Sequence, residues 1–155
     1  MTHESSQDAR GARREQIVEA AKKLFSESGY HNTSVSDIIS LVGIARGTFY
    51  LYFASKNNIF DAILDSALTG LEARIERVRV DDNAPPPRDQ LHERIHRIIT
   101  FLLEDRALSR ILLNHGLMPD ADVAERVNAF YENVIRLIDT SLQYGVGVGL
   151  VRPCD

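Results

Sequence analysis

The chain of 155 residues has little of what membrane-spanning, secreted or disulfide-rich proteins require. Cys154 is its only cysteine, so an internal disulfide is excluded and a reducing compartment is expected. No apolar run approaches the length of a membrane span. The N-terminus carries basic residues but lacks the apolar core of a secretory signal. We therefore expect a cytoplasmic protein with no membrane partner.

Alternation of apolar and polar residues is also scarce. No segment alternates for long enough to predict a strand, whereas apolar residues recur at helical spacing along most of the chain. The fold is therefore predicted to be all-α. After a polar, flexible arm of about a dozen residues, helices are expected near residues 13–28, 35–42, 45–53, 56–80, 89–104, 108–115 and 121–144. Gly145, Gly147 and Gly149 are expected to end the last helix.

The fifth of these helices is expected to turn its apolar residues inward, namely Leu91, Ile95, Ile98, Ile99, Leu102 and Leu103. The segment before it, residues 81–88, contains three consecutive prolines and is predicted to be a linker or stiff loop.

The net charge of −4 is distributed unevenly. Residues 1–60 contain seven Lys or Arg against six Asp or Glu, whereas residues 61–155 contain eleven against sixteen. The first part is therefore slightly basic and the second acidic. Phosphate attraction acts over a short range, because salt screens it within about 10 Å. The composition permits DNA binding by the first part without proving it.

Residues 33–56, which read TSVSDIISLVGIARGTFYLYFASK, contain two short helical patterns separated by Gly43. Ser34 and Asp37 form a plausible capping pair at the start of the first pattern. Two short helices joined by a glycine turn are the layout of a helix-turn-helix, whose second helix enters the major groove of DNA.

The second helix carries the side chains that a DNA-reading surface needs. Arg46 can reach a guanine edge or a phosphate, and Gly47 keeps the first turn slim where the backbone nears DNA. Thr48 can donate to a phosphate, and the hydroxyls of Tyr50 and Tyr52 can reach the DNA backbone. The alternative for the two tyrosines is packing in the core, as expected for Phe49 and Phe53.

Two further residues lie at predicted helix N-termini, where free N–H groups and the helix dipole favour anions. Thr33 precedes the second helix and Lys56 begins the fourth, so both are predicted to bind phosphate. The complete predicted DNA surface comprises Thr33, Ser34, Ala45, Arg46, Gly47, Thr48, Tyr50, Tyr52 and Lys56.

The same stretch, together with Leu24–Tyr30 upstream, closely resembles the signature of the TetR family of transcriptional regulators. The resemblance implies that residues 1–55 form the helix-turn-helix DNA-binding domain and residues 56–155 a helical effector-binding and regulatory domain. It also implies a homodimer, most often a repressor, that binds a pseudo-palindromic operator in double-stranded DNA. A small-molecule effector, expected to be lipophilic or aromatic, would release it.

Three departures from the family pattern affect details of this expectation. Ala45 stands where a serine is common, and Ile39 stands where a small alanine is common. The ending at residues 151–155 resembles the loop that leads into the last family helices, which usually form the dimer interface. Either the sequence is truncated before those helices, or the dimer forms through other helices.

The effector-binding residues are predicted less specifically, because this part of the family has little sequence signature. Most of the candidates could be ordinary core residues, and His115 and Tyr131 are preferred because a polar tip in an apolar setting can orient a ligand. The candidates are Phe101, Leu102, Leu112, His115, Met118, Phe130, Tyr131 and Val134.

A competing interpretation comes from His92, Glu93 and His96, which match the H-E-x-x-H pattern of zinc hydrolases. Both histidines would share one face of a helix, as a zinc site requires. However, Leu102 occupies the place where a third histidine ligand would be expected, and no strand is predicted to bind an extended peptide. A third interpretation is a helical interaction module that does not bind DNA. The preferred prediction is a regulator with no catalytic residues, metal or cofactor.

Overall fold

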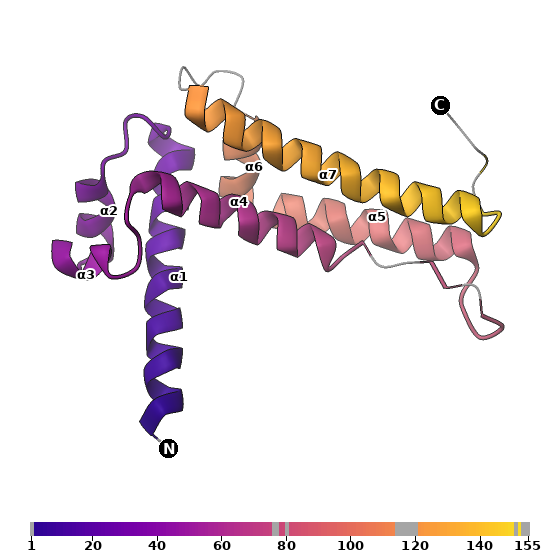
Figure 1. Cartoon of the computed structure of the whole chain (residues 1–155), viewed down its shortest axis with the longest axis horizontal. Helices are drawn as coiled ribbons and strands as arrows, with labels where there is room; N and C mark the ends of the chain where they lie inside the picture. The colour runs from indigo at the N-terminus through magenta and orange to yellow at the C-terminus, as the bar shows by residue number, and fades with distance from the viewer. Residues whose placement is uncertain (1, 76–77, 80, 114–120, 151, 153–155) are drawn as a thin grey trace.

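All regular structure in the described part of the computed structural model is helical, which confirms the predicted fold class (Figure 1). The structure describes residues 2–75, 78–79, 81–113, 121–150 and 152, with side chains from residue 8 onward. The helices are α1 (Thr2–Ser28), α2 (Val35–Val42), α3 (Arg46–Tyr50), α4 (Lys56–Glu72), α5 (Pro87–Glu104), α6 (Arg106–Leu113) and α7 (Ala121–Gly147). In Figure 1, α2 and α3 lie on one side of α1, and α4 to α7 extend away from the other.

Helix α1 begins near the start of the chain, so the expected flexible arm is wrong. Residues 8–16 are all exposed, and the first buried residue of the helix is Ile17. Figure 1 shows this first half projecting beyond α2 and α3. Alanine, arginine and glutamate favour helix without needing a core to cover them. The polar composition of this segment is therefore compatible with a solvent-exposed helix as well as with a flexible arm.

The turn between α2 and α3 follows from local chemistry. The Ser34 hydroxyl caps the Asp37 N–H at 3.1 Å, and the Asp37 carboxylate accepts from the Ser34 N–H at 2.7 Å, which confirms the capping pair. Gly43 ends α2 at φ 72, and its N–H donates to the carbonyl of Ile39. Glycine is favoured in the left-handed conformation because the Cβ of any other residue meets a steric penalty there.

Helices α3 and α4 are both shorter than predicted. Helix α3 ends at Tyr50, and the chain continues as a turn until Phe53, which is buried with Phe49 as expected. Helix α4 ends at Glu72 because its buried stripe ends at Leu71, and residues 72 and 73 are exposed. It is therefore about 26 Å long rather than about 37 Å.

Helix α5 departs most from expectation, because none of its residues is fully buried. Ile98 and Leu102 are half-buried, whereas a stripe of four residues is exposed, namely Leu91, Ile95, Ile99 and Leu103. The predicted inward orientation of these four is wrong. The helix contacts α4 and α6. These contacts cover only part of its apolar face, and the four residues named above remain exposed. None of the described helices is long and apolar enough to cross a bilayer.

Helix α7 continues past Tyr144, where it was expected to end. Gly149, at φ 76, is the residue that stops it, because it takes the left-handed conformation. The N–H of Leu150 then donates to the carbonyl of Gly145 at 2.9 Å, which closes the helix end.

Helix α1 joins α2 and α3 to the rest of the molecule. It packs against α2, α4 and α6, and its buried residues Ile17, Ala21 and Phe25 belong to the same core as residues of α4, α6 and α7. Lys22 also donates to the carboxylate of Asp105 at 2.7 Å. The same carboxylate accepts the N–H of Leu108 in the first turn of α6. Burial lowers the pKa of Lys22, but its hydrogen bonds and charge interactions with Asp105 and Glu19 outweigh that effect and raise it.

Replacing Gly43 by alanine should destabilise the fold by about 1 kcal/mol, because alanine resists a positive φ. Gly147→Ala is the matched control, since a Cβ at Gly147 meets nothing within 4 Å and its φ is not in the left-handed region. Urea unfolding followed by circular dichroism measures both variants. Equal stability of Gly43→Ala and the unmutated chain would contradict the assigned role of the turn.

Candidate nucleic-acid interface

Helix α3 is held by one face and exposes the other. Phe49 and Phe53 are 0% and 4% exposed and lie in the core. Ala45, Arg46 and Gly47 are all exposed on the opposite side. The apolar spacing of the two phenylalanines therefore positions a short row of polar and small residues at the surface.

Arg46 and Tyr50 lie together on the exposed face. The Arg46 guanidinium is 5.9 Å from the centre of the Tyr50 ring, and Tyr50 is 47% exposed. Arg46 forms no ion pair or hydrogen bond within the part of the chain that the structure describes. Its donors therefore remain available to an external acceptor.

Gly47 is exposed within α3, and a Cβ placed on it would meet no atom within 4 Å. Its backbone does not have a positive φ. Neither packing nor backbone geometry within the chain therefore requires glycine at this position, although glycine weakens a helix by about 0.5–1 kcal/mol relative to alanine. An external backbone that approaches α3 closely would account for it.

Two other residues of the predicted DNA surface, one in α3 and one directly before it, offer fewer side-chain donors to an external partner. Thr48 is half-buried beside Phe49. Ala45 precedes the helix in an extended conformation and makes no side-chain cap. The first N–H groups of α3 are therefore not covered by a side chain from that residue.

Thr33 and Ser34 lie where predicted, at the start of α2, but their hydroxyls already serve the fold. The Thr33 side chain is 2% exposed and donates to the carbonyl of Gly29 at 2.9 Å. The Ser34 hydroxyl donates to Asp37 at 2.7 Å, and the Ser34 side-chain and backbone hydrogen bonds lower the pKa of the Asp37 carboxyl. The Thr33 hydroxyl thus has no proton left for a phosphate.

Lys56 lies at the start of α4, and its ammonium bonds to two backbone carbonyls in the segment that precedes α2. Its Nζ donates to the carbonyls of Tyr30 at 2.7 Å and Thr33 at 2.9 Å. It also lies 4.0 Å from the centre of the Tyr30 ring. Lys56 therefore fixes α4 to the turn before α2, a tertiary role that its position in the sequence did not indicate.

Two arginines of α1 join this surface although the sequence reasoning did not include them. Arg10 is 6.0 Å from the centre of the Tyr52 ring, and Arg14 is 5.0 Å from that of Phe53. Tyr52 itself is half-buried in the turn after α3. The available signal was the spacing of Arg10 and Arg14, which puts both on one face if the segment is helical.

The predicted effector-binding residues lie among α5, α6 and α7. Leu112 and Phe130 are buried in the core, and Phe101, Leu102, Tyr131 and Val134 are half-buried against it. The Tyr131 hydroxyl donates to the carbonyl of Leu112 at 3.0 Å, and burial raises the pKa of that hydroxyl. His115 and Met118 lie outside the described residues.

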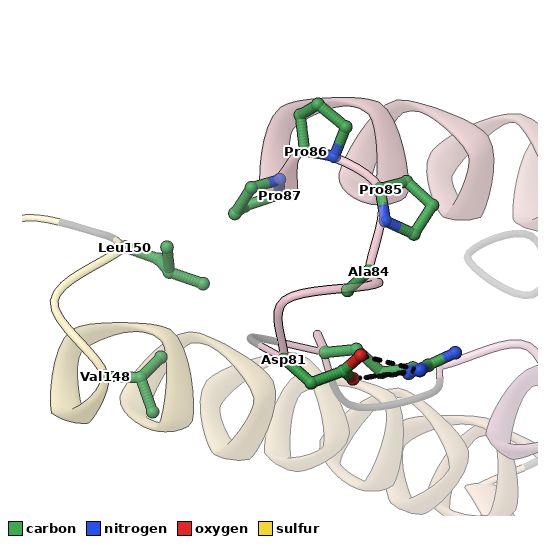
Figure 2. A pocket seen from close by; sticks show the side chains of 8 residues that line it. Asp81, Ala84, Pro85, Pro86, Pro87, Val148 and Leu150 are labelled. Atoms are coloured by element: carbon green, nitrogen blue, oxygen red, sulfur yellow. Dashed lines mark hydrogen bonds and ion pairs between the residues drawn. The ribbon is translucent and has the colours of Figure 1, made fainter.

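A separate pocket of about 410 Å³ lies between the start of α5 and the end of α7 (Figure 2). In Figure 1, these two helix ends lie at the opposite end of the molecule from α3. Figure 2 shows Pro85, Pro86 and Pro87 on one side of it and Val148 and Leu150 on the other. Asp81 on its wall is paired with Arg79 at 2.9 Å. None of the predicted effector-binding residues that the structure describes lines this pocket.

The residues of the zinc-hydrolase pattern are exposed on α5. His92, Glu93 and His96 all face solvent, and Glu93 pairs with Arg97 at 2.9 Å. Within the described part of the chain, no group of three or more His, Cys, Asp or Glu is placed to hold a metal ion. The geometry therefore gives this pattern no third protein ligand.

Comparison with known proteins bears on the same stretch of chain. The family model for bacterial regulatory proteins of the tetR family matches residues 17–63, which include α2, α3 and the start of α4. The HTH-type transcriptional regulator YvdT of Bacillus subtilis (strain 168) is 38% identical over 119 residues. That alignment covers 76% of this chain but only 59% of YvdT.

Solved structures agree in fold along most of the chain. The TetR family transcriptional regulator PfmR from Thermus thermophilus has a TM-score of 0.66 and 28% identity, covering 90% of this chain and 75% of PfmR. The transcriptional regulator FadR from Bacillus subtilis, solved in complex with stearoyl-CoA, has a TM-score of 0.67 and 24% identity. The latter covers 90% of this chain and 75% of FadR. The stretch with the capped α2, the glycine turn and the exposed α3 therefore matches the family model for bacterial regulatory proteins of the tetR family, and the chain shares its fold with the TetR family regulator PfmR.

Proposed function

We propose that the chain is a transcriptional regulator that reads double-stranded DNA with α3 and responds to a small-molecule effector. The observation that carries the proposal is the exposed face of α3, where an unpaired Arg46 and a solvent-facing Tyr50 flank Gly47. Arginine contacts guanine edges or phosphates, and tyrosine hydroxyls contact the DNA backbone. Gly47 allows the DNA backbone to come close to the helix.

The DNA surface that we propose consists of two groups. The first group contacts DNA through side chains, or, at Gly47, allows the DNA backbone to come close to α3. It consists of Arg46, Gly47, Thr48, Tyr50 and Tyr52. At the N-termini of α2 and α3, marked by Thr33, Ser34 and Ala45, we propose that phosphates accept from the backbone N–H groups that no internal acceptor occupies. Lys56 adds positive charge at the start of α4.

Binding as a homodimer to a pseudo-palindromic operator is part of the proposal. Two recognition helices related by a twofold axis would lie about 34 Å apart, one turn of DNA. An effector that binds better to a different spacing would then release the DNA, to the extent of its differential affinity. The protein would act as a repressor if its operator overlaps a promoter.

The effector is proposed to be lipophilic or aromatic. The residues proposed to bind it are mainly apolar: Phe130 lies in the core, and Phe101, Val134 and Tyr131 pack against it. The stearoyl-CoA complex of the similar FadR supports an effector with a long apolar chain. Apolar cavities with a few polar groups are typical of small-molecule sites.

The proposal predicts that selection from a random duplex pool enriches a pseudo-palindrome, and that the double variant Arg46→Ala, Tyr50→Ala loses the enrichment. Each good arginine contact is worth about 1–3 kcal/mol, so Arg46→Ala alone should weaken binding by about tenfold or more. Arg136→Ala is the matched control, because Arg136 is also exposed but lies on α7. Failure of the unmutated chain to enrich any duplex would overturn the proposed function.

Gly47→Ala separates DNA contact from folding. The fold should keep its stability or gain about 0.5–1 kcal/mol, because alanine favours helix. DNA affinity should fall by about tenfold or more, since an added methyl in a packed contact costs about 1–3 kcal/mol. Unfolding by urea and fluorescence anisotropy with labelled duplex measure the two effects. An unchanged affinity for DNA would show that the DNA backbone does not come close to Gly47.

Stearoyl-CoA is expected to weaken DNA binding, because the proposed effector site is apolar. The measurement is anisotropy of labelled operator duplex at increasing stearoyl-CoA, with coenzyme A lacking the acyl chain as the control. Equal effects of the two compounds would rule out recognition of the apolar chain. No effect of stearoyl-CoA would exclude long-chain acyl-CoA as the effector class.

A further inference from the structure

The exposed first half of α1 and the turn after α3 form a second feature of the DNA-binding side. An open pocket of about 430 Å³ lies between them, lined by Arg10, Gly11, Arg14, Leu51 and Tyr52. Two of its five lining residues are arginines, and Leu51 is 71% exposed although it is apolar. The pocket thus brings two positive charges beside the end of the proposed recognition helix.

Neither arginine of the pocket is neutralised by an acidic side chain among the described residues. Within the part of the chain that the structure describes, Arg10 and Arg14 form no ion pair and no hydrogen bond. Arg10 lies over the ring of Tyr52 and Arg14 over the ring of Phe53. Stacking on a ring restrains a guanidinium while its N–H groups at the edge stay free for an acceptor. Arg13, in contrast, donates to Gln16 at 2.9 Å and is absent from the pocket.

The position of the pocket suits one particular anion. An α-helix with its side chains is about as wide as the major groove, so the residues at its ends and flanks meet the phosphates on the groove walls. Helix α3 has only five residues, and Leu51 and Tyr52 follow it directly. A pocket that contains these two residues therefore lies where a helix inserted in the groove meets the DNA backbone.

We propose that the pocket of Arg10, Gly11, Arg14, Leu51 and Tyr52 binds one backbone phosphate beside the base pairs that α3 reads. The proposal rests on the proposed function, because the phosphate belongs to the same DNA. Arginine forks bind phosphate oxygens with charge-assisted hydrogen bonds. Gly11 leaves the pocket wall open, since a Cβ there would meet no atom within 4 Å. The first half of α1 thus becomes part of the DNA-binding surface rather than a solvated extension.

The competing explanation is that both arginines only stabilise the aromatic residues on which they stack. The two explanations differ in their dependence on salt. Each phosphate that a protein neutralises releases counterions and adds about 0.9 to the slope of log affinity against log salt concentration. A purely structural arginine would change the stability of the fold and leave that slope unchanged.

The decisive pair of variants is Gly11→Glu and Gly11→Gln. Both side chains favour helix over glycine and fit the open space, so both variants should fold. The glutamate places a negative charge in the pocket without removing either arginine, whereas glutamine matches its size and is neutral. Anisotropy with the selected operator and with an unrelated duplex, at several salt concentrations, measures affinity and slope.

Gly11→Glu should weaken binding to both duplexes by about the same factor and lower the salt slope by about 0.9 for each chain bound. Gly11→Gln should keep the slope of the unmutated chain. If Gly11→Glu and Gly11→Gln both kept that slope while DNA was still bound, the phosphate pocket would be overturned and the proposed function would stand. If the unmutated chain bound neither duplex, both proposals would fall together.

A second set of variants tests the arginines themselves. Arg10→Lys combined with Arg14→Lys keeps the charge but loses the planar fork, so the slope should remain while affinity falls by about tenfold. Arg10→Ala combined with Arg14→Ala should lose both, and Arg13→Ala should change neither. A slope for the double alanine variant equal to that of Arg13→Ala would also overturn the pocket.

Discussion

The packing of α1 against three partners is the constraint on which the rest of the structure depends. Its buried residues Ile17, Ala21 and Phe25 face α2, α4 and α6 at the same time. These contacts hold the helix-turn-helix at a definite angle to the remaining helices. Helix α1 contacts α6 through a buried stripe, and Lys22 pairs with Asp105, the residue directly before α6. A displacement of α6 would therefore change the surroundings of α1. Any effector that acts through α6 would therefore reach the DNA-binding side through packing.

Features that depend on neighbouring residues could be predicted from the sequence. The capping pair of Ser34 and Asp37 and the left-handed Gly43 each involve contacts within a few residues, so α2 has the predicted bounds. The exposed face of α3 follows from the spacing of Phe49 and Phe53, which bury the opposite side. Local chemistry was sufficient to locate Arg46, Gly47 and Tyr50 on one surface.

Features that depend on distant residues could not be predicted in the same way. Lys56 was expected to contact phosphate because it begins a helix, but its ammonium meets carbonyls 23 and 26 residues earlier in the chain. The apolar stripe on α5 has helical periodicity, but periodicity alone does not determine whether another helix covers the stripe. One of its residues, Leu103, is 69% exposed. The polarity of residues 8–16 has two explanations, disorder and solvation, and the structure selects solvation for this helix.

The single hydrophobic core has a consequence for how the molecule melts. Buried residues from Ile17 in α1 to Phe130 in α7 form one continuous cluster, with no boundary between the DNA-binding side and the rest. We therefore expect the chain to unfold in one cooperative transition, for which the calorimetric and van 't Hoff enthalpies would coincide. A compound bound among α5, α6 and α7 would then raise the melting temperature of the helix-turn-helix as well, because binding stabilises the whole folded state.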